Sequence, residues 1–383
     1  MLDTVFWLCL ALIFHVYVGY FLILKFLSWF IPSPETTPSF PGNEVPVTVL
    51  IAAYNEEKVI RRRLQNLLES EYPEDKLFIL VASDGSDDRT VALAEEFQSP
   101  RIRVLDFKER RGKALTHNAA MRFVETDFVI FSDAESSFAP DYISRTLAAF
   151  QADPRVGCVV GNLVFHATDS ITGSSARSFW DYEKTLRHLE SRLRIFATGT
   201  GSCMAIRTAL WRDLEPTDDS DFITALDVIV QGYYVLFLPE AVAYDELPAN
   251  SPRREFQIRV RMTSKNLVGT LRRWGLKNWF RHPFVSFGLL SHKILRWLCP
   301  FFFAGVLISS VLLLWRGEKQ YEGFVILETV LLCLAALGGI AARARTRIPL
   351  ASHLFSFAVA NAGMALGVIR GLTGQAPVAY RQK

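Results

Sequence analysis

The sequence predicts an α/β protein with a mostly parallel sheet, attached to membrane-spanning helices at both ends. Half of the 383 residues are hydrophobic, and the long apolar runs are concentrated near the two ends of the chain. The region between them alternates short β-branched or aromatic runs with amphipathic stretches, as strands and helices do along a parallel sheet. Charged residues make up 21% of the chain, which excludes intrinsic disorder.

The N-terminal apolar run predicts a membrane anchor. It extends from Val5 to Ile31 over 27 residues and is broken only by His15 and Lys25. That length is enough to cross a hydrocarbon core of about 30 Å. A cleaved signal peptide fits poorly, because the preceding residues MLDT carry no positive charge. We therefore expect an uncleaved anchor whose N-terminus lies outside the cell.

Three further apolar stretches near the C-terminus are each about 20 residues long, the length that a spanning helix needs. They cover residues 297–315, 323–342 and 350–369. The loop before the last stretch carries Arg343, Arg345 and Arg347, so the positive-inside rule places this loop in the cytoplasm. Four spans with an external N-terminus give the same orientation. The last span then leaves the C-terminal tail outside.

Composition divides the chain into six segments. These are an anchor (1–31), a Pro-rich linker (32–46), an α/β domain (47–250), basic amphipathic interface helices (251–292), C-terminal membrane helices (293–370) and a tail (371–383). From Arg253 to Arg281 there are nine Lys or Arg residues and one acidic residue. Such a stripe suits either nucleic acid or an anionic membrane. Its position beside an apolar segment favours membrane lipids, and we expect no nucleic-acid partner.

The second span opens with a group of polar and aromatic side chains. They are His292, Lys293, Arg296 and Trp297. We interpret them as cations that extend to the lipid headgroups beside an interfacial tryptophan. The alternative is that they contact a lipid-linked or anionic acceptor.

Four runs in the middle region predict buried strands, and the stretches between them predict helices. The strands cover residues 47–54, 77–83, 102–107 and 128–133, and the helices cover 56–70, 88–98 and 113–124. In an open α/β sheet, ligands bind beyond the carboxyl ends of the strands. The residues that follow each strand are therefore the candidates for a site.

Carboxylates collect at these strand ends. Asp84 follows the second strand, and Asp133 and Glu135 follow the fourth. Residues two apart in an extended segment point the same way, so an Asp-x-Glu pair can hold Mg²⁺ or Mn²⁺. Asp87 and Asp88 are interpreted instead as helix and turn caps.

A basic helix start completes the predicted constellation. Lys113, preceded by Arg111 and Gly112, opens the third predicted helix. The cations and the free N–H groups of that first turn suit a diphosphate. The order of these signals along one α/β domain is more specific than any one of them.

The chain resembles a family 2 glycosyltransferase with the GT-A fold, of the membrane-embedded bacterial type. The resemblance covers about residues 45–300. It rests on the segments VTVLIAAYNEE, VASDGSDDRT, RRGKALTHN, FSDAE, WDYEK, TGTGSCMAIR, DSDFITALDVIVQGYYVLFLPEAVAYDE and SHKILRW. It implies a Rossmann-like, mostly parallel sheet with one N-terminal and about three C-terminal transmembrane helices.

The resemblance implies a role for each matching position on the donor side. The residues implied to bind the nucleotide-sugar are Ala53, Tyr54, Asn55, Glu56, Asp84, Lys113 and Asp133. Asp133 and Glu135 stand where the family has Asp-x-Asp, the metal and diphosphate site. Glutamate is one methylene longer than aspartate, which changes the geometry of that pair.

The resemblance also implies a general base. The matching position is Asp221, which lies eleven residues before Gly232 and Tyr233, and Ser220 replaces the family's preceding acidic residue. The acidic turn of Asp218, Asp219 and Asp221 equally suits a helix N-terminus.

Other matches fall on the acceptor side and near the diphosphate. The acceptor-side residues are Trp180, Tyr182, Glu183, Gly201 and Ser202, and the diphosphate candidates are Arg259 and Arg261. Core packing is the alternative for the aromatic pair, and an ordinary turn is the alternative for the glycine loop. The stretch that matches the family's Gln-x-x-Arg-Trp reads FQIRVR and has no tryptophan. This departure counts against processive synthesis.

The implied enzyme is an inverting glycosyltransferase in the bacterial plasma membrane, with its catalytic domain in the cytoplasm. It would move a sugar from a nucleotide-sugar, by resemblance a UDP-sugar, to a glycan or lipid-linked acceptor. One alternative is a processive synthase that needs homo-oligomers or export partners, because four spans are few for a polymer channel. A second alternative is a catalytically silent membrane scaffold, supported by Ser220 and Glu135.

Overall fold

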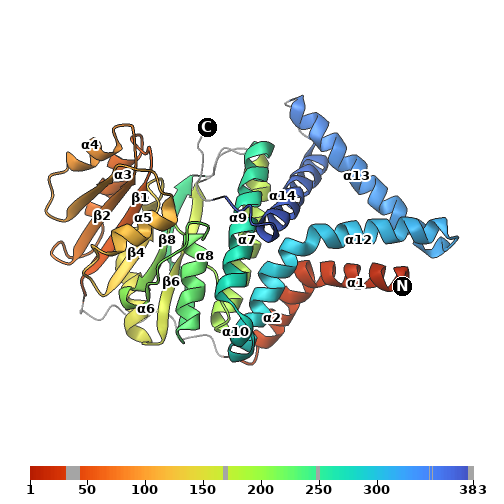
Figure 1. Cartoon of the computed structure of the whole chain (residues 1–383), viewed down its shortest axis with the longest axis horizontal. Helices are drawn as coiled ribbons and strands as arrows, with labels where there is room; N and C mark the ends of the chain where they lie inside the picture. Colours follow the sequence, from red (N-terminus) through yellow and green to blue (C-terminus); the bar gives the residue numbers. More distant parts are fainter. Residues whose placement is uncertain (32–43, 167–170, 247–250, 345, 347, 378–383) are drawn as a thin grey trace.

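An α/β domain occupies one end of the molecule, and long apolar helices project from its other side (Figure 1). The computed structural model describes residues 1–31, 44–166, 171–246, 251–344, 346 and 348–377. Most of the predicted linker (32–43), Arg345, Arg347 and the end of the predicted tail (378–383) lie outside the described residues.

The first half of the sheet is parallel, as the sequence predicts. Its strands are β1 (Val47–Ala53), β2 (Leu77–Asp84), β3 (Ile102–Phe107) and β4 (Phe128–Ser132). β1 lies between β2 and β4, and β3 pairs with the outer side of β2. All four predicted strands are confirmed, and their carboxyl ends share one edge.

The second half of the sheet brings in antiparallel pairs. Its strands are β5 (Ser137–Phe138), β6 (Val156–His166), β7 (Met204–Arg207) and β8 (Tyr234–Glu246). β7 runs antiparallel to both β4 and β6, β6 pairs in parallel with β8, and β5 is antiparallel to β8. The sheet order is β3-β2-β1-β4-β7-β6-β8-β5, so the sheet is mostly but not wholly parallel.

Helices cover both faces of the sheet, which explains why the strands are apolar almost throughout. One face packs against α3 (Ile60–Leu68), α4 (Thr90–Glu95) and α6 (Tyr142–Ala152). The other packs against α5 (Lys113–Met121) and α8 (Ser220–Val230). Along β1, Val49 and Ile51 enter the first layer and Leu50 enters the second.

The first predicted helix starts four residues later than expected. The backbone of Asn55 is left-handed, with φ at +57°. The next two N–H groups bond to the loop after β2: Glu56 donates to Thr90 Oγ1 at 2.7 Å and Glu57 donates to Asp88 Oδ2 at 3.2 Å. Because these contacts hold the chain in a turn, α3 begins only at Ile60.

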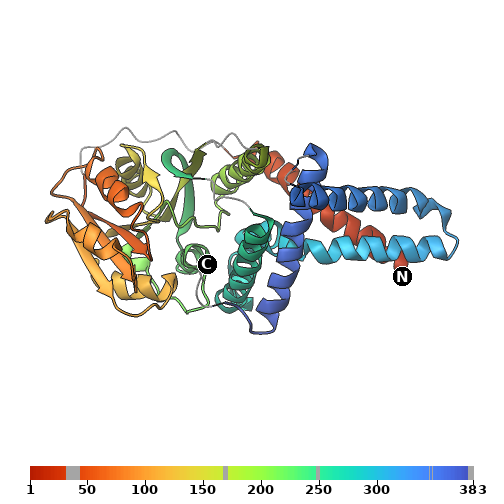
Figure 2. The ribbon, with the colours of Figure 1, turned by 90° about the horizontal axis from the view of Figure 1, so that it is seen from above.

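Four helical segments are long and apolar enough to cross a membrane, as the sequence predicts. They cover Leu2–Ser28, Pro283–Trp315, Lys319–Arg343 and Pro349–Leu372. The first consists of α1 (Leu2–Phe14), a π-helical turn and α2 (Tyr20–Ser28). The others contain α12 (Leu295–Trp315), α13 (Glu322–Arg343) and α14 (Pro349–Leu372). α1, α12 and α13 extend away from the sheet (Figures 1 and 2).

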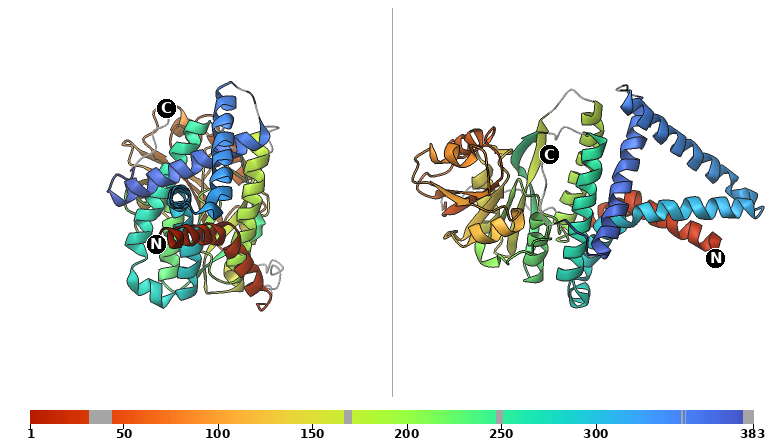
Figure 3. Two further views of the ribbon diagram at one scale, coloured as in Figure 1. Left: turned by 90° about the vertical axis from the view of Figure 1, so that its right-hand side faces the viewer. Right: turned by 45° about the horizontal axis from the view of Figure 1, so that its top comes forward.

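Two long helices stand between the sheet and the membrane helices (Figures 1 and 3). They are α7 (Ile171–Arg192) and α9 (Pro252–Arg273). The basic α9 directs part of its charge inward: the Arg272 guanidinium bonds to the fully buried carboxylate of Asp218, and Arg273 Nε lies 3.6 Å from Asp227 Oδ1.

Two short helices follow α9 in the predicted interface segment. They are α10 (Leu276–Arg281) and α11 (Pro283–Gly288). Leu276, Phe280 and Phe284 are 75%, 78% and 76% exposed, so these helices present bulky apolar side chains outward. Their position at a membrane surface remains a prediction.

Candidate functional site

One ammonium group joins two carboxylates at the carboxyl edge of the sheet. Asp133 follows β4, Lys113 opens α5, and Asp221 lies in the first turn of α8. Lys113 Nζ lies 2.7 Å from Asp133 Oδ1 and 3.6 Å from Asp221 Oδ1. Burial would lower the pKa of Lys113, but the two carboxylates raise it above its ordinary value. The structure thus brings together three of the predicted site residues.

The loop before β7 closes on this group. Ser202 Oγ donates to Asp133 Oδ2 at 3.0 Å. A Cβ atom on Gly201 would lie 2.3 Å from Asp221 Oδ2 and 2.5 Å from Lys113 Nζ. A side chain at this position would therefore push the Asp221 carboxylate and the Lys113 ammonium out of their present places. Both predicted acceptor-side residues of the loop therefore lie at the carboxylate pair.

The acidic turn at the start of α8 places a second aspartate beside Asp221. Asp219 occupies the N-cap position of α8. Burial and the neighbouring Asp221 raise the pKa of Asp219 to about 6, against the opposing effect of Arg261 and Lys265 on α9. Arg261 therefore belongs to the surroundings of the acidic turn. Arg259 instead pairs with Glu255, with Nε 2.7 Å from Oε1.

Negative charge accumulates on the other side of Asp133. Burial, together with the neighbouring Glu135 and Asp133, raises the pKa of Glu56 to about 7. These hard oxygen donors are of the type that Mg²⁺ and Mn²⁺ prefer. Within the described residues, no three His, Cys, Asp or Glu side chains form a ready-made metal cluster. Asp133 and Glu135 therefore remain the predicted metal ligands, and a divalent ion there would need further oxygens from a bound ligand.

Asp84 builds the start of α5. Its buried carboxylate accepts hydrogen bonds from the backbone N–H groups of Arg111, at 2.8 Å, and Gly112, at 2.9 Å, and from Thr116 Oγ1, at 2.8 Å. These bonds fix the turn from which Lys113 projects. A role for Asp84 in binding a nucleotide remains a prediction, whereas its role in placing Lys113 is visible.

The strand-end loops after β1 and β2 are bonded to each other. Asn55 Nδ2 donates to Asp87 Oδ1 at 2.6 Å, and the Asp87 N–H donates back to Asn55 Oδ1 at 3.0 Å. Asp88 Oδ1 accepts from the Thr90 N–H at 2.9 Å, so its predicted role as a cap is confirmed. The ring of Tyr54 lies 3.7 Å from the Arg110 guanidinium, and Ala53 is the buried last residue of β1.

The three acceptor-side candidates on α7 lie away from the carboxylate pair. Trp180 Nε1 donates to the Leu163 carbonyl at 2.9 Å, so this indole packs on β6. The Tyr182 hydroxyl donates to the Tyr17 carbonyl of the N-terminal membrane segment at 3.1 Å. Glu183 faces the start of the second membrane segment. These side chains hold elements together in the structure, and a direct role with an acceptor remains a prediction.

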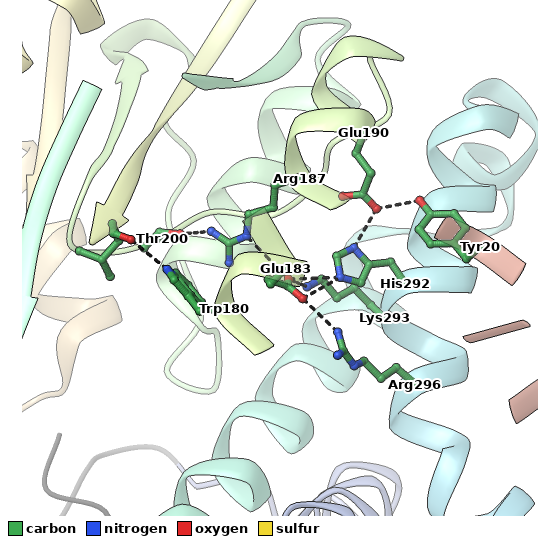
Figure 4. A network of polar contacts seen from close by, with 10 residues as sticks. Tyr20, Trp180, Glu183, Arg187, Glu190, Thr200, His292, Lys293 and Arg296 are labelled. Atoms are coloured by element: carbon green, nitrogen blue, oxygen red, sulfur yellow. Dashed lines mark hydrogen bonds and ion pairs between the residues drawn. The ribbon is translucent and has the colours of Figure 1, made fainter. Parts of the chain in front are cut away.

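Glu183 is the centre of a buried polar network (Figure 4). Its carboxylate lies 3.3 Å from Lys293 Nζ, 3.0 Å from Arg296 Nη1 and 3.2 Å from His292 Nε2. The interpretation of these three residues as exposed, lipid-facing cations is wrong, because their side chains are 16% exposed or less and point at Glu183.

The same network reaches the membrane anchor. The Tyr20 hydroxyl of α2 donates to Glu190 Oε1 at 2.7 Å, and His292 Nδ1 lies 2.8 Å from the same oxygen. In the other direction, Arg187 Nη1 donates to Thr200 Oγ1 at 2.8 Å (Figure 4). Thr200 precedes Gly201, so the network runs from the first membrane helix to the loop at Asp221.

Sequence reasoning missed several members of this network. They are Tyr20, Arg187, Glu190 and Thr200. Positions 183, 187 and 190 follow helical spacing and place three charged side chains on one face of α7. This spacing is visible in the sequence, but the sequence does not show that these side chains contact residues over 100 positions away, such as His292.

Comparisons with known proteins identify the α/β region. Residues 48–214 match the model of the family described as glycosyl transferase family 2. The chain is 30% identical over 128 residues to the poly-beta-1,6-N-acetyl-D-glucosamine synthase of Staphylococcus epidermidis, a match that covers 33% of this chain and 31% of the relative. It is 27% identical over 265 residues to the probable glycosyltransferase YdaM of Bacillus subtilis, covering 64% and 62% of the two chains. The chain thus spans less than two thirds of either relative.

A solved structure shares the fold along the whole chain. It is the mannosyltransferase PcManGT from Pyrobaculum calidifontis, in complex with GDP-Man and Mn²⁺. The TM-score is 0.70 at 19% sequence identity, and the match covers 98% of this chain and 100% of that one. The GT-A fold, with its accompanying apolar helices, is therefore shown.

We predict that Glu183→Gln destabilises the whole protein. Burial alone would raise the pKa of Glu183, but Lys293, His292 and Arg296 hold it well below its ordinary value. Removal of the charge leaves buried cations uncompensated, which costs about 3–5 kcal/mol and lowers Tm by roughly 10 °C. Thermal unfolding of the purified protein in detergent measures this loss.

Acid should mimic this substitution. Because the folded-state pKa is depressed, the stabilisation is complete above the ordinary glutamate pKa of about 4.3 and is lost as the pH falls through the folded value. The Tm of the original protein should therefore fall as the pH is lowered, and the Tm of Glu183→Gln should fall less over the same pH range. Glu240→Gln, at an exposed position, is the matched control and should leave Tm unchanged. Equal Tm values for the two variants would contradict the role of the network.

Proposed function

We propose that this chain, which carries a family 2 glycosyltransferase domain, is an inverting transferase that uses a nucleoside-diphosphate sugar. The observation that supports this best is the bridge from Asp133 through Lys113 to Asp221, closed by the glycine loop at the strand ends. Such an arrangement offers cations and metal-binding oxygens to a diphosphate on one side and a carboxylate base on the other. The acceptor is a glycan or a lipid-linked glycan.

The donor we propose is a UDP-sugar, as the resemblance implies. The complex of the structural neighbour with GDP-Man makes GDP-mannose the alternative donor to test. The relative from Staphylococcus epidermidis carries the name of a synthase of an N-acetylglucosamine polymer, which supports a place in polysaccharide or glycolipid assembly. The four apolar segments support a plasma-membrane location. We place the active site on the cytoplasmic side, where nucleotide-sugars are made.

The reaction requires a base on the acceptor side. We assign this role to Asp221, because its carboxylate lies under the Gly201 backbone and faces Lys113. It takes a proton from the acceptor hydroxyl as that oxygen attacks C1 of the donor sugar. The C1–O bond to the diphosphate breaks on the opposite face, and the anomeric configuration inverts. We assign to Lys113 and Arg261 the role of contacting the departing diphosphate.

We propose that Asp133 and Glu135, assisted by Glu56, hold Mg²⁺ or Mn²⁺ with the donor. The bound ion would supply neutralising charge for the diphosphate. This assignment is supported by oxygen donors of the type that Mg²⁺ and Mn²⁺ prefer, which gather at the end of β4. Lys113 remains the cation that the chain provides for Asp133.

A single transfer is favoured over processive synthesis. The stretch that would hold a processive acceptor lacks its tryptophan, and Arg259 within it pairs with Glu255. Chain extension with homo-oligomers or export partners is the alternative within the class. Product length in the presence of excess donor separates the two.

A nucleotide-sugar screen tests the function as a whole. The purified full-length protein in detergent should release the nucleotide from one donor class, faster when a lipid-linked or glycan acceptor is added. The silent-scaffold alternative predicts neither release nor binding of any nucleotide-sugar, and that result would overturn the proposal.

We predict that Asp221→Asn separates donor binding from transfer. The substitution keeps the shape of the side chain but removes the proton acceptor, so transfer should fall by about 10²–10⁴. Donor affinity, measured by calorimetry, should change little. Asp219→Asn is the matched control and should be milder. If Asp219→Asn is the more severe variant, Asp219 is the base and the position counted from Gly232 is wrong.

We also predict that turnover and donor binding depend on a divalent ion. A chelator should abolish both, and Mn²⁺ or Mg²⁺ should restore them. Asp133→Asn should weaken metal-dependent donor binding more than Glu135→Gln, because Asp133 also anchors Lys113 and Ser202. Calorimetric binding of the nucleotide with and without metal provides a measurement independent of activity. Full donor binding in excess chelator would show that the donor binds without a metal ion.

A further inference from the structure

The last apolar helix is the exception among the four candidate spans. α14 has 24 residues and is long enough to cross a membrane, but its mean hydropathy is the lowest of the four. It runs across the direction of α12 in Figures 1 and 2, whereas α1 lies beside α12 in Figure 1. We propose that α14 does not cross the membrane and lies against the surface of the leaflet on the catalytic side, with both of its ends on that side.

A glycine stripe clamps α14 onto α9. A Cβ on Gly363 would lie 2.7 Å from Arg259 Cβ, one on Gly367 would lie 2.7 Å from Thr263 Cβ, and one on Gly371 would lie 3.3 Å from the Ser264 carbonyl oxygen. Successive turns of α14 therefore meet successive turns of α9. The two helices lie side by side and point the same way over the last half of α14.

The position of α9 fixes the C-terminal end of α14. The Arg272 side chain of α9 bonds to Asp218, Lys265 Nζ lies 3.4 Å from the Asp218 carbonyl oxygen, and Trp274 is buried in the core of the α/β domain. A helix with this density of Lys and Arg does not lie in hydrocarbon. Because Gly371 packs on α9, the end of α14 lies beside the catalytic domain and not across a bilayer from it.

The other end of α14 lies on the same side. α13 returns from the far end of α12, where Tyr321 bonds to Asp3 near the N-terminus, and ends at Arg343. The connection to α14 is basic, which assigns it to the cytoplasm. The first turn of α14 packs closely on this end of α13, since a Cβ on Gly338 would lie 2.0 Å from the Ala351 carbonyl oxygen.

The outward face of α14 suits a lipid surface. Leu350, Ile369 and Leu372 are 61%, 49% and 66% exposed, whereas Phe357 turns the other way and its ring packs against Tyr17 and Phe303. Arg370 in the last turn is also exposed. Apolar side chains beside a terminal cation are typical of helices that lie among the headgroups and upper acyl chains of an anionic leaflet. The partner of this face is therefore the membrane surface.

Three crossings and a C-terminus on the catalytic side follow from this placement. They replace the four crossings and external tail that length and hydropathy predict. The inference does not depend on the proposed function, because it concerns only the side of the membrane on which the chain ends.

Reporter fusions to the full-length chain test the inference. Green fluorescent protein fused after Lys383 should fluoresce in a bacterial host, because it matures in the cytoplasm, and alkaline phosphatase at the same position should be inactive. The control is the same pair of reporters inserted at Gly317, in the open turn between α12 and α13, where the opposite result is expected. Active phosphatase and dark fluorescent protein at the C-terminus would overturn the proposal.

A second measurement tests the clamp itself. Gly367→Leu should force the helices apart and raise hydrogen exchange of the α9 amides 256–267 by about tenfold. Ala362→Leu adds similar bulk to the exposed face of α14 and should leave that exchange unchanged. If the α9 amides of both variants exchange hydrogen at the rate of the original protein, α14 does not pack on α9 and the proposed placement of α14 is wrong.

Discussion

The α/β domain and the apolar helices are joined by the ion pairs that the buried carboxylate of Glu183 forms with Lys293 and Arg296. A carboxylate this far from water is stable only when cations and hydrogen-bond donors surround it closely. Here Lys293 and Arg296, from the start of the second membrane segment, supply that charge. Arg187 carries the connection to Thr200 and so to the loop at Asp221. The apolar helices and this loop therefore form one connected structure.

Charge balance at the sheet edge explains why the site is built around Lys113. Asp133 and Asp221 come from different halves of the domain, and without a shared cation they would repel each other. The ammonium holds them in place before any ligand binds. Glu56 lies outside this pairing, and burial together with Glu135 and Asp133 raises the pKa of its carboxyl to about 7. A donor that brings its own divalent ion would bind beside these carboxyl groups.

The local features were predictable because local periodicity determines them. Alternating apolar residues on β1 face two helical layers, so a buried parallel sheet follows from the sequence. The delayed start of α3 was not predictable, because it depends on contacts with Thr90 and Asp88 in a loop over 30 residues away. The same limit applies to His292, whose partners lie on α7. Hydropathy alone predicts that α14 spans the membrane, because hydropathy carries no information on tertiary contacts. The contact of Gly363, Gly367 and Gly371 with α9 is visible only in the structure.

Spacing along the sequence does not by itself decide whether Asp219 or Asp221 is the base. The two residues are separated by one position at the start of α8, one at the N-cap and one in the first turn. Both therefore lie at the positive end of the helix dipole and near the same cations. Burial and mutual repulsion raise the pKa of Asp219 to about 6, which leaves Asp221 as the carboxylate paired with Lys113. The pair thus divides into Asp219, whose pKa is raised, and Asp221, which lies beneath the glycine loop beside Lys113. That division depends on geometry and not on the spacing from Gly232.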